Sequence, residues 1–360
     1  MNSNIISRAK KGQFSLIAEI GVNYYDIAEK LNLSLIDAAK LMVAEAKNAG
    51  IHAVKFQSYK ADTLASKNSP AYWDLKEEQT KSQYELFKKF DFFGYDEYKE
   101  LSHFCSQVGI EFLSTPFDIE SADYLYDLMH VYKISSSDLN NKPFLAYQAK
   151  KNKPILLSTG ASNLDEIVEA VETIRHYNSQ PLVLLHCVLQ YPTPFVDANL
   201  NKILSLKKEF PDIIVGYSDH TKPTPDMDVC KTAYNLGAVI IEKHFTLDKS
   251  LVGNDHYHGM DPSDAKRLLE GIEFIEEIRG SEELCCLSSE SMARANARRS
   301  LVSSCRIPKG TIITENLLTY KRPGTGISPD KMQSILGKVA RLDIEEDTVI
   351  EPNMLGDWAD

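Results

Sequence analysis

The stretch Phe14-Ser15-Leu16-Ile17-Ala18-Glu19-Ile20-Gly21-Val22-Asn23 decides the fold, because it contains the first β-rich run and shows how that run ends. The run ends in Gly-Val-Asn, whereas an open dinucleotide-binding sheet begins with a G-x-G-x-x-G turn. A helix is predicted to follow, with an N-cap at Ser34 and a C-cap at Gly50. The stretch therefore begins a β-then-α alternation, and the number of its repeats decides between an open sheet and a closed barrel.

The β-then-α alternation continues along most of the chain. The eight strand-like runs are Phe14–Ile20, Ala53–Gln57, Ile110–Pro116, Val131–Ser135, Pro154–Ser158, Leu182–Cys187, Ile213–Tyr217 and Val239–Phe245. Helical patterns between and after them include 165–177, 199–210 and 262–278. Strand–helix units in this number, over about 270 residues, have the size and order of a TIM barrel, whereas an open doubly wound sheet usually has fewer strands. The sequence therefore predicts an α/β protein whose residues 1–280 form a (β/α)8 TIM barrel.

The pattern changes near residue 296, where short β-like runs are broken by turns. These runs are Arg299–Ser303, Thr311–Thr314, Leu317–Lys321 and Thr348–Glu351. Short β-like runs separated by turns are typical of a compact β-rich domain, here of about 60 residues. We therefore predict a small β-rich domain over residues 296–360, joined to the barrel by a polar linker over residues 281–295.

The composition narrows the class of protein. The chain has 360 residues, a formal net charge of -11 and a pI near 5.4, which disfavours a general nucleic-acid or anionic-membrane partner. The start of the chain has no apolar segment typical of a signal peptide, and no apolar run reaches the roughly 18 residues of a membrane span. Its six cysteines form no C-x-x-C pair. These features predict a cytoplasmic protein with reduced thiols.

Polar side chains recur where the predicted strands end. Active sites of TIM barrels lie at the carboxyl ends of the strands, so these residues are candidates for one site. The strand-end candidates are Glu19, Lys55, Gln57, Thr115, Lys133, Ser136, Asp138, Ser158, Ser218, His220 and His244. A barrel with a purely structural role has no need for such groups at every strand end, which favours an enzyme.

Two kinds of chemistry follow from this ring. Lys55 and Lys133 among hydroxyl groups suit an anion that carries phosphate and carboxylate, although a single strand lysine is more often an ion-pair partner. His220 and His244 end adjacent predicted strands, so their imidazoles can converge on a divalent ion such as Mn²⁺. His186 lies in a buried run and is interpreted as structural. Glu19 could either pair with a lysine or take part in catalysis.

Seven motifs, in this order along the chain, carry a resemblance to a known family. They are Ala18–Asn23, Lys55–Gln57, Ser114–Phe117, Ser158–Gly160, Tyr191–Pro194, Gly216–Thr221 and Glu242–Thr246. Together they resemble the sialic acid synthase family, and the likeness continues through Gly253-Asn254-Asp255-His256. In the tail, Lys321–Gly326 resembles the C-terminal antifreeze-like (SAF) domain of the same family. The resemblance covers nearly the whole chain and implies a TIM barrel followed by a SAF domain.

The resemblance also implies a reaction. Members of the family condense phosphoenolpyruvate (PEP) with N-acetylmannosamine or a related amino-hexose. The products are a nine-carbon 2-keto-3-deoxy sugar acid and phosphate. They use a divalent metal, for which Mn²⁺ is the first expectation and Mg²⁺ or Co²⁺ are alternatives. They are homodimers in which the SAF domain of one subunit caps the barrel of the other.

The family's functional residues can be carried onto this sequence position by position. The implied metal ligands are His220 and His244, and Glu19 is the implied catalytic carboxylate. The implied PEP-binding residues are Lys55, Thr115, Lys133, Ser136, Ser158 and Ser218. The implied sugar-binding residues are Gln57, Asp138, Tyr191, Asp255 and, from the SAF domain, Arg322.

The sequence departs from the family pattern at three places. Tyr24-Tyr25-Asp26 and an additional helical piece follow Asn23, and Val188-Leu189 replaces the usual polar pair after Cys187. The segment 62–95 is also long for a barrel connection, and long barrel loops are often lids over the site. These departures leave open a 6-deoxy diacetamido hexose, with legionaminic or pseudaminic acid as product. We expect Tyr24, Leu189 and the lid to govern that choice.

Two other interpretations remain. A seven- or eight-carbon ketosugar acid synthase also joins PEP to an aldose on a barrel, but it takes phosphorylated sugars and lacks the SAF tail. A non-catalytic carbohydrate-binding protein could use the SAF domain alone, but it would not need the polar ring at the barrel mouth. Whether the sugar must be phosphorylated distinguishes the first interpretation from a sialic-acid-type synthase. Whether phosphate is released distinguishes the second.

Overall fold

The structure is a computed structural model that describes residues 3–73, 75–76, 78–253 and 255–358. It divides into two compact units, Met1–Arg279 and Gly280–Asp360. Among the described residues, no helix combines the length and the apolar character that crossing a bilayer requires.

The first unit is built around eight parallel strands. They are β1 (Ser15–Gly21), β2 (Ala53–Ser58), β3 (Glu111–Pro116), β4 (Tyr132–Ile134), β5 (Ile155–Ser158), β6 (Leu182–His186), β7 (Ile214–Asp219) and β8 (Ile240–His244). Hydrogen-bonded neighbours follow the order β3-β2-β1-β8-β7-β6-β5-β4. Because β3 also lies beside β4, the sheet closes on itself. The predicted TIM barrel is confirmed, and all eight predicted runs contain the strands to within two residues at each end.

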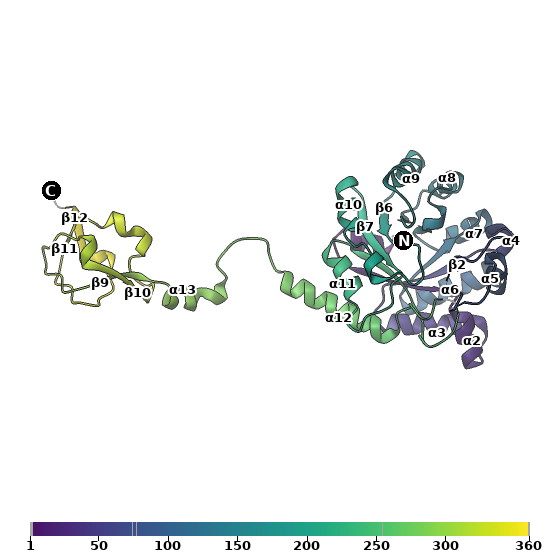
Figure 1. The fold of residues 1–360 in the computed structure, drawn as a ribbon, viewed down its shortest axis with the longest axis horizontal. Coiled ribbons are helices and arrows are strands. Elements are labelled where there is room, and N and C mark those ends of the chain that lie inside the picture. Colours follow the sequence, from purple (N-terminus) through teal and green to yellow (C-terminus); the bar gives the residue numbers. More distant parts are fainter. Residues whose placement is uncertain (1–2, 74, 77, 254, 359–360) are drawn as a thin grey trace. The chain divides into compact units, whose positions relative to one another are not determined.

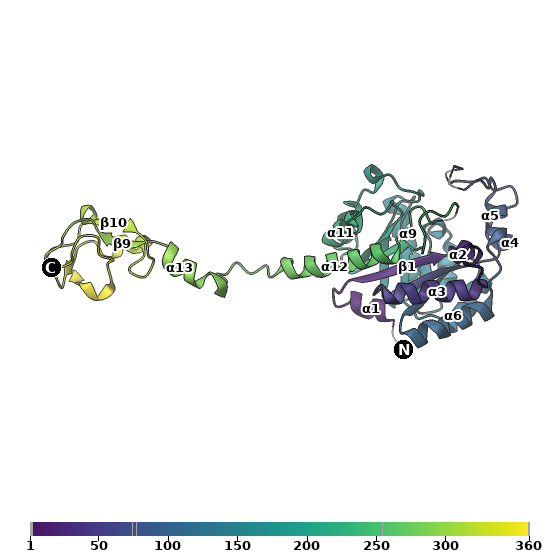
Figure 2. The same cartoon turned by 90° about the horizontal axis from the view of Figure 1, so that it is seen from below.

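Helices surround the strands (Figure 1). The main ones are α3 (Leu35–Asn48), α6 (Tyr95–Val108), α7 (Ile119–Tyr124), α8 (Lys142–Ala149), α9 (Leu164–Tyr177), α10 (Lys202–Glu209), α11 (Asp228–Asn235) and α12 (Pro262–Arg279). Figure 2 shows α3 and α6 side by side. Ser34 is the N-cap of α3, since its hydroxyl accepts from the Asp37 amide at 3.2 Å. The C-cap is Ala49, and Gly50 follows it with a φ of +87°, so the predicted cap was one residue late.

The barrel interior has an apolar lower part that α1 (Asn4–Ala9) closes. Ile5 and Ile6 of this helix pack against the inward side chains of the strands, and the Ile5 amide donates to Oε2 of Glu111 at 2.9 Å. The apolar inward side chains are Ile17, Ala53, Leu113, Val131, Leu156, Val183, Leu185 and Ile240. Since side chains alternate along a strand, the next inward position lies towards the carboxyl ends. That upper layer is polar.

The helical piece after Asn23 is α2 (Tyr24–Leu31). Tyr24 is fully buried and stacks on Phe93 with ring centroids 4.7 Å apart, so it belongs to the core between sheet and helices. The expectation that Tyr24 selects the sugar therefore has no support in its position. Aromatic packing against Phe56 and Phe93 explains why a large side chain follows the strand here.

The segment predicted as a lid has its own structure. It contains α4 (Ala61–Leu64), a bridge between Pro70 and Ser82, and α5 (Gln83–Lys89). Nε1 of Trp73 donates to the carbonyl oxygens of Glu78 and Thr80, both at 3.1 Å. These bonds hold the loop in a turn, with Trp73 beside the barrel mouth. Asp74, which the sequence analysis placed within this segment, lies outside the described residues.

The second unit has two antiparallel strand pairs, β9 (Ser300–Ser303) with β10 (Leu318–Lys321) and β11 (Lys338–Ala340) with β12 (Leu355–Trp358). Its apolar core includes Leu301, Ile307, Ile313, Ile344 and Ile350. The predicted runs at 311–314 and 348–351 form only isolated bridges, and β11 and β12 were missed. The helix α13 (Ser291–Ala297), where three alanines favour a helix, spans the predicted boundary between the linker and the second domain.

Short 3₁₀ helices complete the elements. They are η1 (Leu125–Asp127), η2 (Ser136–Asp138), η3 (Phe195–Asp197), η4 (Ser288–Glu290), η5 (Glu315–Leu317), η6 (Pro329–Ser334) and η7 (Pro352–Met354). Of these, η2 bears on the site, because it directly follows β4.

Candidate active site

The upper layer of the barrel interior gathers polar side chains from several strands. Register explains the arrangement, since Glu19 is aligned with Lys55 on one side and with His244 on the other, while Ser218 is aligned with Glu242. The side chains of this layer are all buried: Glu19, Lys55, Thr115, Lys133, Ser158, Ser218, Glu242 and His244. They lie where strand alternation brings inward positions from the carboxyl ends together.

Two lysines and two carboxylates form the base of the site. Nζ of Lys55 forms an ion pair with Glu19, donates to Oγ1 of Thr115 at 3.0 Å, and lies 3.8 Å from Oε2 of Glu242. Nζ of Lys133 lies 3.6 Å from the other oxygen of Glu242. Glu242 thus lies between both ammonium groups, and it also accepts a hydrogen bond from Ser218 at 2.9 Å.

The two carboxylates differ in their protonation. Burial raises the pKa of Glu19 to about 7, against the opposing effect of Lys55. Burial would also raise the pKa of Glu242, but Lys133 and Lys55 outweigh it and lower that pKa. Burial lowers the pKa of Lys133. Near neutral pH Glu242 is therefore charged, whereas Glu19 can both hold and release a proton, as a general acid or base requires.

A break in strand register positions Glu19. The β1–β2 pairing shifts between Glu19 and Gly21, and Gly21 has a φ of +55°, which only glycine adopts without strain. A Cβ at Gly21 would lie 3.3 Å from both Nε2 of Gln57 and Oε1 of Glu19. Gln57 donates to that Glu19 oxygen at 3.0 Å. The bulge and the amide together fix the orientation of the carboxylate.

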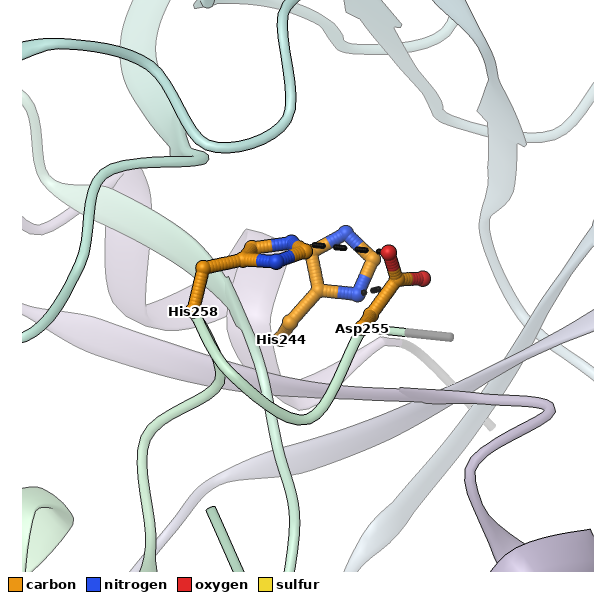
Figure 3. Close-up of side chains that lie close together, drawn as sticks. All are labelled: His244, Asp255 and His258. Carbon is orange, nitrogen blue, oxygen red and sulfur yellow. Dashed lines mark ion pairs between the residues drawn. The ribbon is translucent and has the colours of Figure 1, made fainter. Parts of the chain in front are cut away.

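Imidazole side chains lie beside this group of lysines and carboxylates. Nδ1 of His220 lies 2.6 Å from the carbonyl oxygen of Val188, which leaves its Nε2 available to a ligand. Nδ1 of His244 lies 3.2 Å from Oδ2 of Asp255, and Nε2 of His258 lies 3.5 Å from Oδ1 of the same carboxylate (Figure 3). Ring centroids of His220 and His244 are 5.5 Å apart, and those of His244 and His258 are 4.8 Å apart.

The donor set in this region suits a divalent metal ion. Ligand atoms of His244, Asp255 and His258 all lie within 4.8 Å of one another. Buried ring nitrogens of His244 and His258 have no hydrogen-bond partner among the described residues, and such orphaned groups are expected where a ligand binds. Imidazole nitrogen with carboxylate oxygen is a set that first-row ions such as Mn²⁺ accept. Of the two predicted ligands, His244 lies in this cluster and His220 lies beside it.

A cavity lies above the base, between the barrel mouth and the lid. Its lining residues are Val22, Gln57, Tyr59, Tyr72, Trp73, Glu78, Leu86, Phe87, Phe90, Tyr191, His244, Asp255 and Tyr257. The barrel supplies most of the polar wall of this cavity, while the lid, including α5, supplies aromatic and aliphatic side chains. The predicted lid therefore does line the site.

The structure brings together nearly all the barrel residues that the sequence singled out. A deeper cavity is lined by Glu19, Lys55, Gln57, Thr115, Lys133, Ser136, Ser158, Tyr191, Ser218, His220 and His244. Asp255 lines the cavity under the lid. Asp138 lines neither cavity, because the turn of η2 directs it towards Asn141, whose Nδ2 lies 3.3 Å from its carboxylate. Arg322 belongs to the second unit. Asn254, quoted for the resemblance, lies outside the described residues.

Sequence reasoning did not assign Glu242, His258 or the aromatic lid residues. Glu242 could have been found, since it lies two positions before His244 on one strand and must face the same way. His258 lies in a loop, where no periodicity shows its direction. His186 is paired with the Ala198 carbonyl at 2.8 Å, as its structural interpretation expects. Leu189 lines a separate groove beside α9 and α10.

Comparison with known proteins identifies the family. The sequence model of the NeuB family matches residues 42–284, and that of the SAF domain matches residues 298–356. N,N'-diacetyllegionaminic acid synthase of Legionella pneumophila is 39% identical over 93% of this chain and 92% of its own length. The enzyme of the same name from Campylobacter jejuni is 39% identical over 93% of this chain and 98% of its own.

Solved structures agree with this comparison. The N-acetylneuraminic acid synthetase of Leptospira borgpetersenii, solved in complex with citrate, superimposes with a TM-score of 0.66 at 32% identity. The match covers 78% of this chain and 90% of that one. With these relatives and with the match to more than half of its sequence, the chain belongs to the NeuB family.

Proposed function

We propose that this chain is a metal-dependent synthase that joins PEP to an N-acetylated amino-hexose. The products are a nine-carbon 2-keto-3-deoxy sugar acid and inorganic phosphate. The observation that carries the proposal is the pair of buried lysines, Lys55 and Lys133, beside an imidazole cluster at the mouth of a TIM barrel. The legionaminic and sialic acid synthases among the relatives support the same reaction class.

PEP is assigned to the base of the site. A phosphate and a carboxylate need several positive charges and hydrogen-bond donors, which the two lysines and the hydroxyls supply. Oγ of Ser158 is buried without a hydrogen-bond partner among the described residues, so it is free to donate to an oxygen of the substrate. Thr115, Ser136 and Ser218 complete the proposed set. Protonation of Glu19 would add to the net positive charge of this region.

The metal is assigned to the imidazole side of the cavity. His220 and His244 would hold it, and when bound it supplies Lewis-acid polarisation of a carbonyl oxygen. Mn²⁺ suits the donor set best, with Co²⁺ and Mg²⁺ as alternatives. Asp255, whose Oδ2 lies 3.2 Å from Nδ1 of His244, offers a carboxylate oxygen to the same ion.

Glu19 is assigned the proton transfers. In the overall reaction C3 of PEP bonds to the aldehyde carbon, water adds to C2, and the C2–O bond to phosphate breaks. The water loses both protons in the course of the reaction, one to the aldehyde oxygen and the other to the departing phosphate. Glu19 is buried, is oriented by Gln57, and has a pKa raised to about 7 by burial, so it can take a proton and return it.

The lid favours one type of sugar. Leu86, Phe87 and Phe90 give the cavity an apolar wall. A buried methyl group gains about 0.8 kcal/mol there, whereas a hydroxyl without a partner is destabilised. A 6-deoxy diacetamido hexose has a methyl group where N-acetylmannosamine has a hydroxymethyl group, and its second acetamido group adds another methyl where N-acetylmannosamine has a hydroxyl. We therefore propose the 6-deoxy sugar as preferred substrate and a legionaminic-type acid as product, in line with the relatives of that name.

The SAF unit is proposed to complete the site of a second copy, in a domain-swapped homodimer. Arg322 is exposed and forms no ion pair with the residues that the structure describes, so its guanidinium is available to a ligand on another chain. Five N–H donors suit it to a sugar or a carboxylate.

The six free cysteines fit a reducing compartment, and we place the protein in the cytoplasm.

Phosphate release tests the proposal. The full-length protein is given PEP and Mn²⁺ with N-acetylmannosamine or with 6-deoxy diacetamido hexoses, and phosphate is measured with and without EDTA. We expect release with a 6-deoxy sugar and its loss in EDTA. Release only with a phosphorylated sugar would favour a shorter ketosugar acid synthase. No release from folded, metal-loaded protein would leave the carbohydrate-binding alternative.

A further inference from the structure

We propose that His258 is a third imidazole ligand of the divalent ion at the barrel mouth. The proposal rests on the proposed metal-dependent function and extends the ligand set beyond His220 and His244. The loop that follows β8 returns across the barrel mouth and places His258 near the carboxyl end of β8. Met260 donates to the His244 carbonyl at 2.7 Å, so this part of the loop is tied to the strand end.

The burial of His258 needs an explanation. Its side chain is fully buried, and neither ring nitrogen has a hydrogen-bond partner among the described residues. Unpaired buried polar atoms destabilise a fold, so they are usually paired with another group. An apolar side chain of the same size would avoid that cost. The ring is therefore expected to bind a partner other than the protein itself.

A neighbouring histidine provides the contrast. His256 lies two residues earlier in the same loop and is equally buried. Its Nδ1 lies 2.7 Å from the hydroxyl oxygen of Thr246, and its Nε2 lies 2.9 Å from Oδ2 of Asp26. Both nitrogens of His256 are thus satisfied within the protein, as a structural histidine requires. His258 shares the loop but makes no such hydrogen bond with the described residues; its Nε2 lies only within ion-pair distance, 3.5 Å, of Oδ1 of Asp255.

The position of His258 points to a cation. Its ligand nitrogen lies within 4.8 Å of ligand atoms of His244 and Asp255, and Figure 3 shows both rings beside that carboxylate. The Asp255 amide lies 3.3 Å from Oδ1 of Asn23, which anchors the loop where the carboxylate begins. Lone pairs on neutral imidazoles, together with a carboxylate, attract a positive ion. A third nitrogen ligand would also shift preference from Mg²⁺ towards Mn²⁺ or Co²⁺.

Metal affinity tests the proposal without reference to turnover. Protein freed of metal by chelation is titrated with Mn²⁺, and free ion is measured from its electron paramagnetic resonance signal. We expect His258→Gln to weaken Mn²⁺ binding by about 10–100-fold. His186→Gln is the matched control, because it removes a buried imidazole that is bonded to the Ala198 carbonyl. That control should bind Mn²⁺ as the wild type does.

A count of nitrogen ligands gives an independent readout. X-ray absorption of the Mn²⁺-loaded protein should show one imidazole fewer in His258→Gln than in the wild type. If that variant does not fold, His258→Ala with added free imidazole replaces it, and recovery of Mn²⁺ affinity is expected.

Three outcomes would overturn the proposal. Unchanged affinity and imidazole count in His258→Gln would exclude a ligand role and leave the proposed synthase standing. Slower turnover with unchanged Mn²⁺ affinity would make His258 a substrate contact instead. Phosphate release that persists in EDTA would show that the reaction needs no metal. That result would contradict this proposal but not the proposed condensation.

Discussion

Nζ of Lys243 lies 2.6 Å from Oδ2 of Asp219, and each side chain is only 1% exposed. Because side chains alternate along β8, Lys243 faces away from the cavity that its neighbours Glu242 and His244 line. The pair also holds the chain after His220, since Asp219 accepts from the Thr221 amide at 2.9 Å and Lys243 donates to the Thr221 carbonyl at 2.7 Å. A structural ion pair outside the barrel thus supports a proposed metal ligand inside it.

Breaking this pair should destabilise the protein strongly. Lys243→Met leaves Asp219 charged in an apolar layer, and loss of one partner of a buried pair typically costs about 3–5 kcal/mol. Urea unfolding of the metal-free protein measures the effect. The control is the exposed pair Lys142–Glu169, 2.6 Å apart, where Lys142→Met should cost at most about 1 kcal/mol. Equal losses in the two variants would contradict the argument.

Glu19→Gln should slow catalysis while the fold persists. The amide keeps the size of the side chain but cannot exchange the proton, and loss of a general acid or base lowers turnover by about 10²–10⁴-fold. Steady-state phosphate release measures kcat. Glu111→Gln is the control, because Glu111 is a partly buried carboxylate near the closed end of the same barrel. Near-normal turnover of Glu19→Gln would remove Glu19 from the proton transfers.

Lys133→Gln should weaken the binding of PEP. A hydrogen bond to a charged group contributes about 1.5–3 kcal/mol, so KM for PEP should rise by about 10–100-fold, while KM for the sugar changes less. Isothermal titration of the variant with PEP checks the same quantity without turnover. Lys142→Gln, on the surface, should have no effect. If the sugar KM rises instead, the two halves of the site are assigned the wrong way round.

The lid should control the choice of sugar. Phe87→Asn places a polar group in the apolar wall, and a contact of one or two methyl groups is typically worth about 10–200-fold in specificity. The ratio of kcat/KM for the 6-deoxy diacetamido hexose to that for N-acetylmannosamine should fall by at least about 10-fold. Leu164→Asn, an exposed position on α9, is the control. An unchanged ratio would locate the selection elsewhere.

The fold was predictable because its strands repeat. Buried runs such as 53–57 and 182–187 are short, apolar and separated by amphipathic helices, so counting them identified the barrel. The tail was harder, since β11 (Lys338–Ala340) and β12 (Leu355–Trp358) are short and pair with an irregular register. In so small a unit, tertiary pairing decides which short runs become strands.

The site was predictable where it lies on strands. Lys55, Lys133 and His244 lie on buried strands, and the geometry of a barrel brings their inward positions together whatever the loops do. Loop residues have no such constraint, so His258 was missed and Asp138 was expected in a cavity that it does not line. The sequence also indicated that the segment 62–95 lies over the site, but it did not show which of its side chains line the cavity, because that segment has no regular period.

The proposed domain swap predicts that two inactive variants restore each other. Glu19→Gln disables the barrel, and Arg322→Ala disables the SAF contribution. If Arg322 serves the partner's site, a mixed dimer has one intact site, made from the unaltered barrel of one chain and the unaltered SAF domain of the other. Random mixing should then recover about a quarter of wild-type activity. Phosphate release from co-refolded chains measures it. If Arg322 instead serves its own barrel, no mixed dimer has an intact site, and activity would stay at the level of the separate variants.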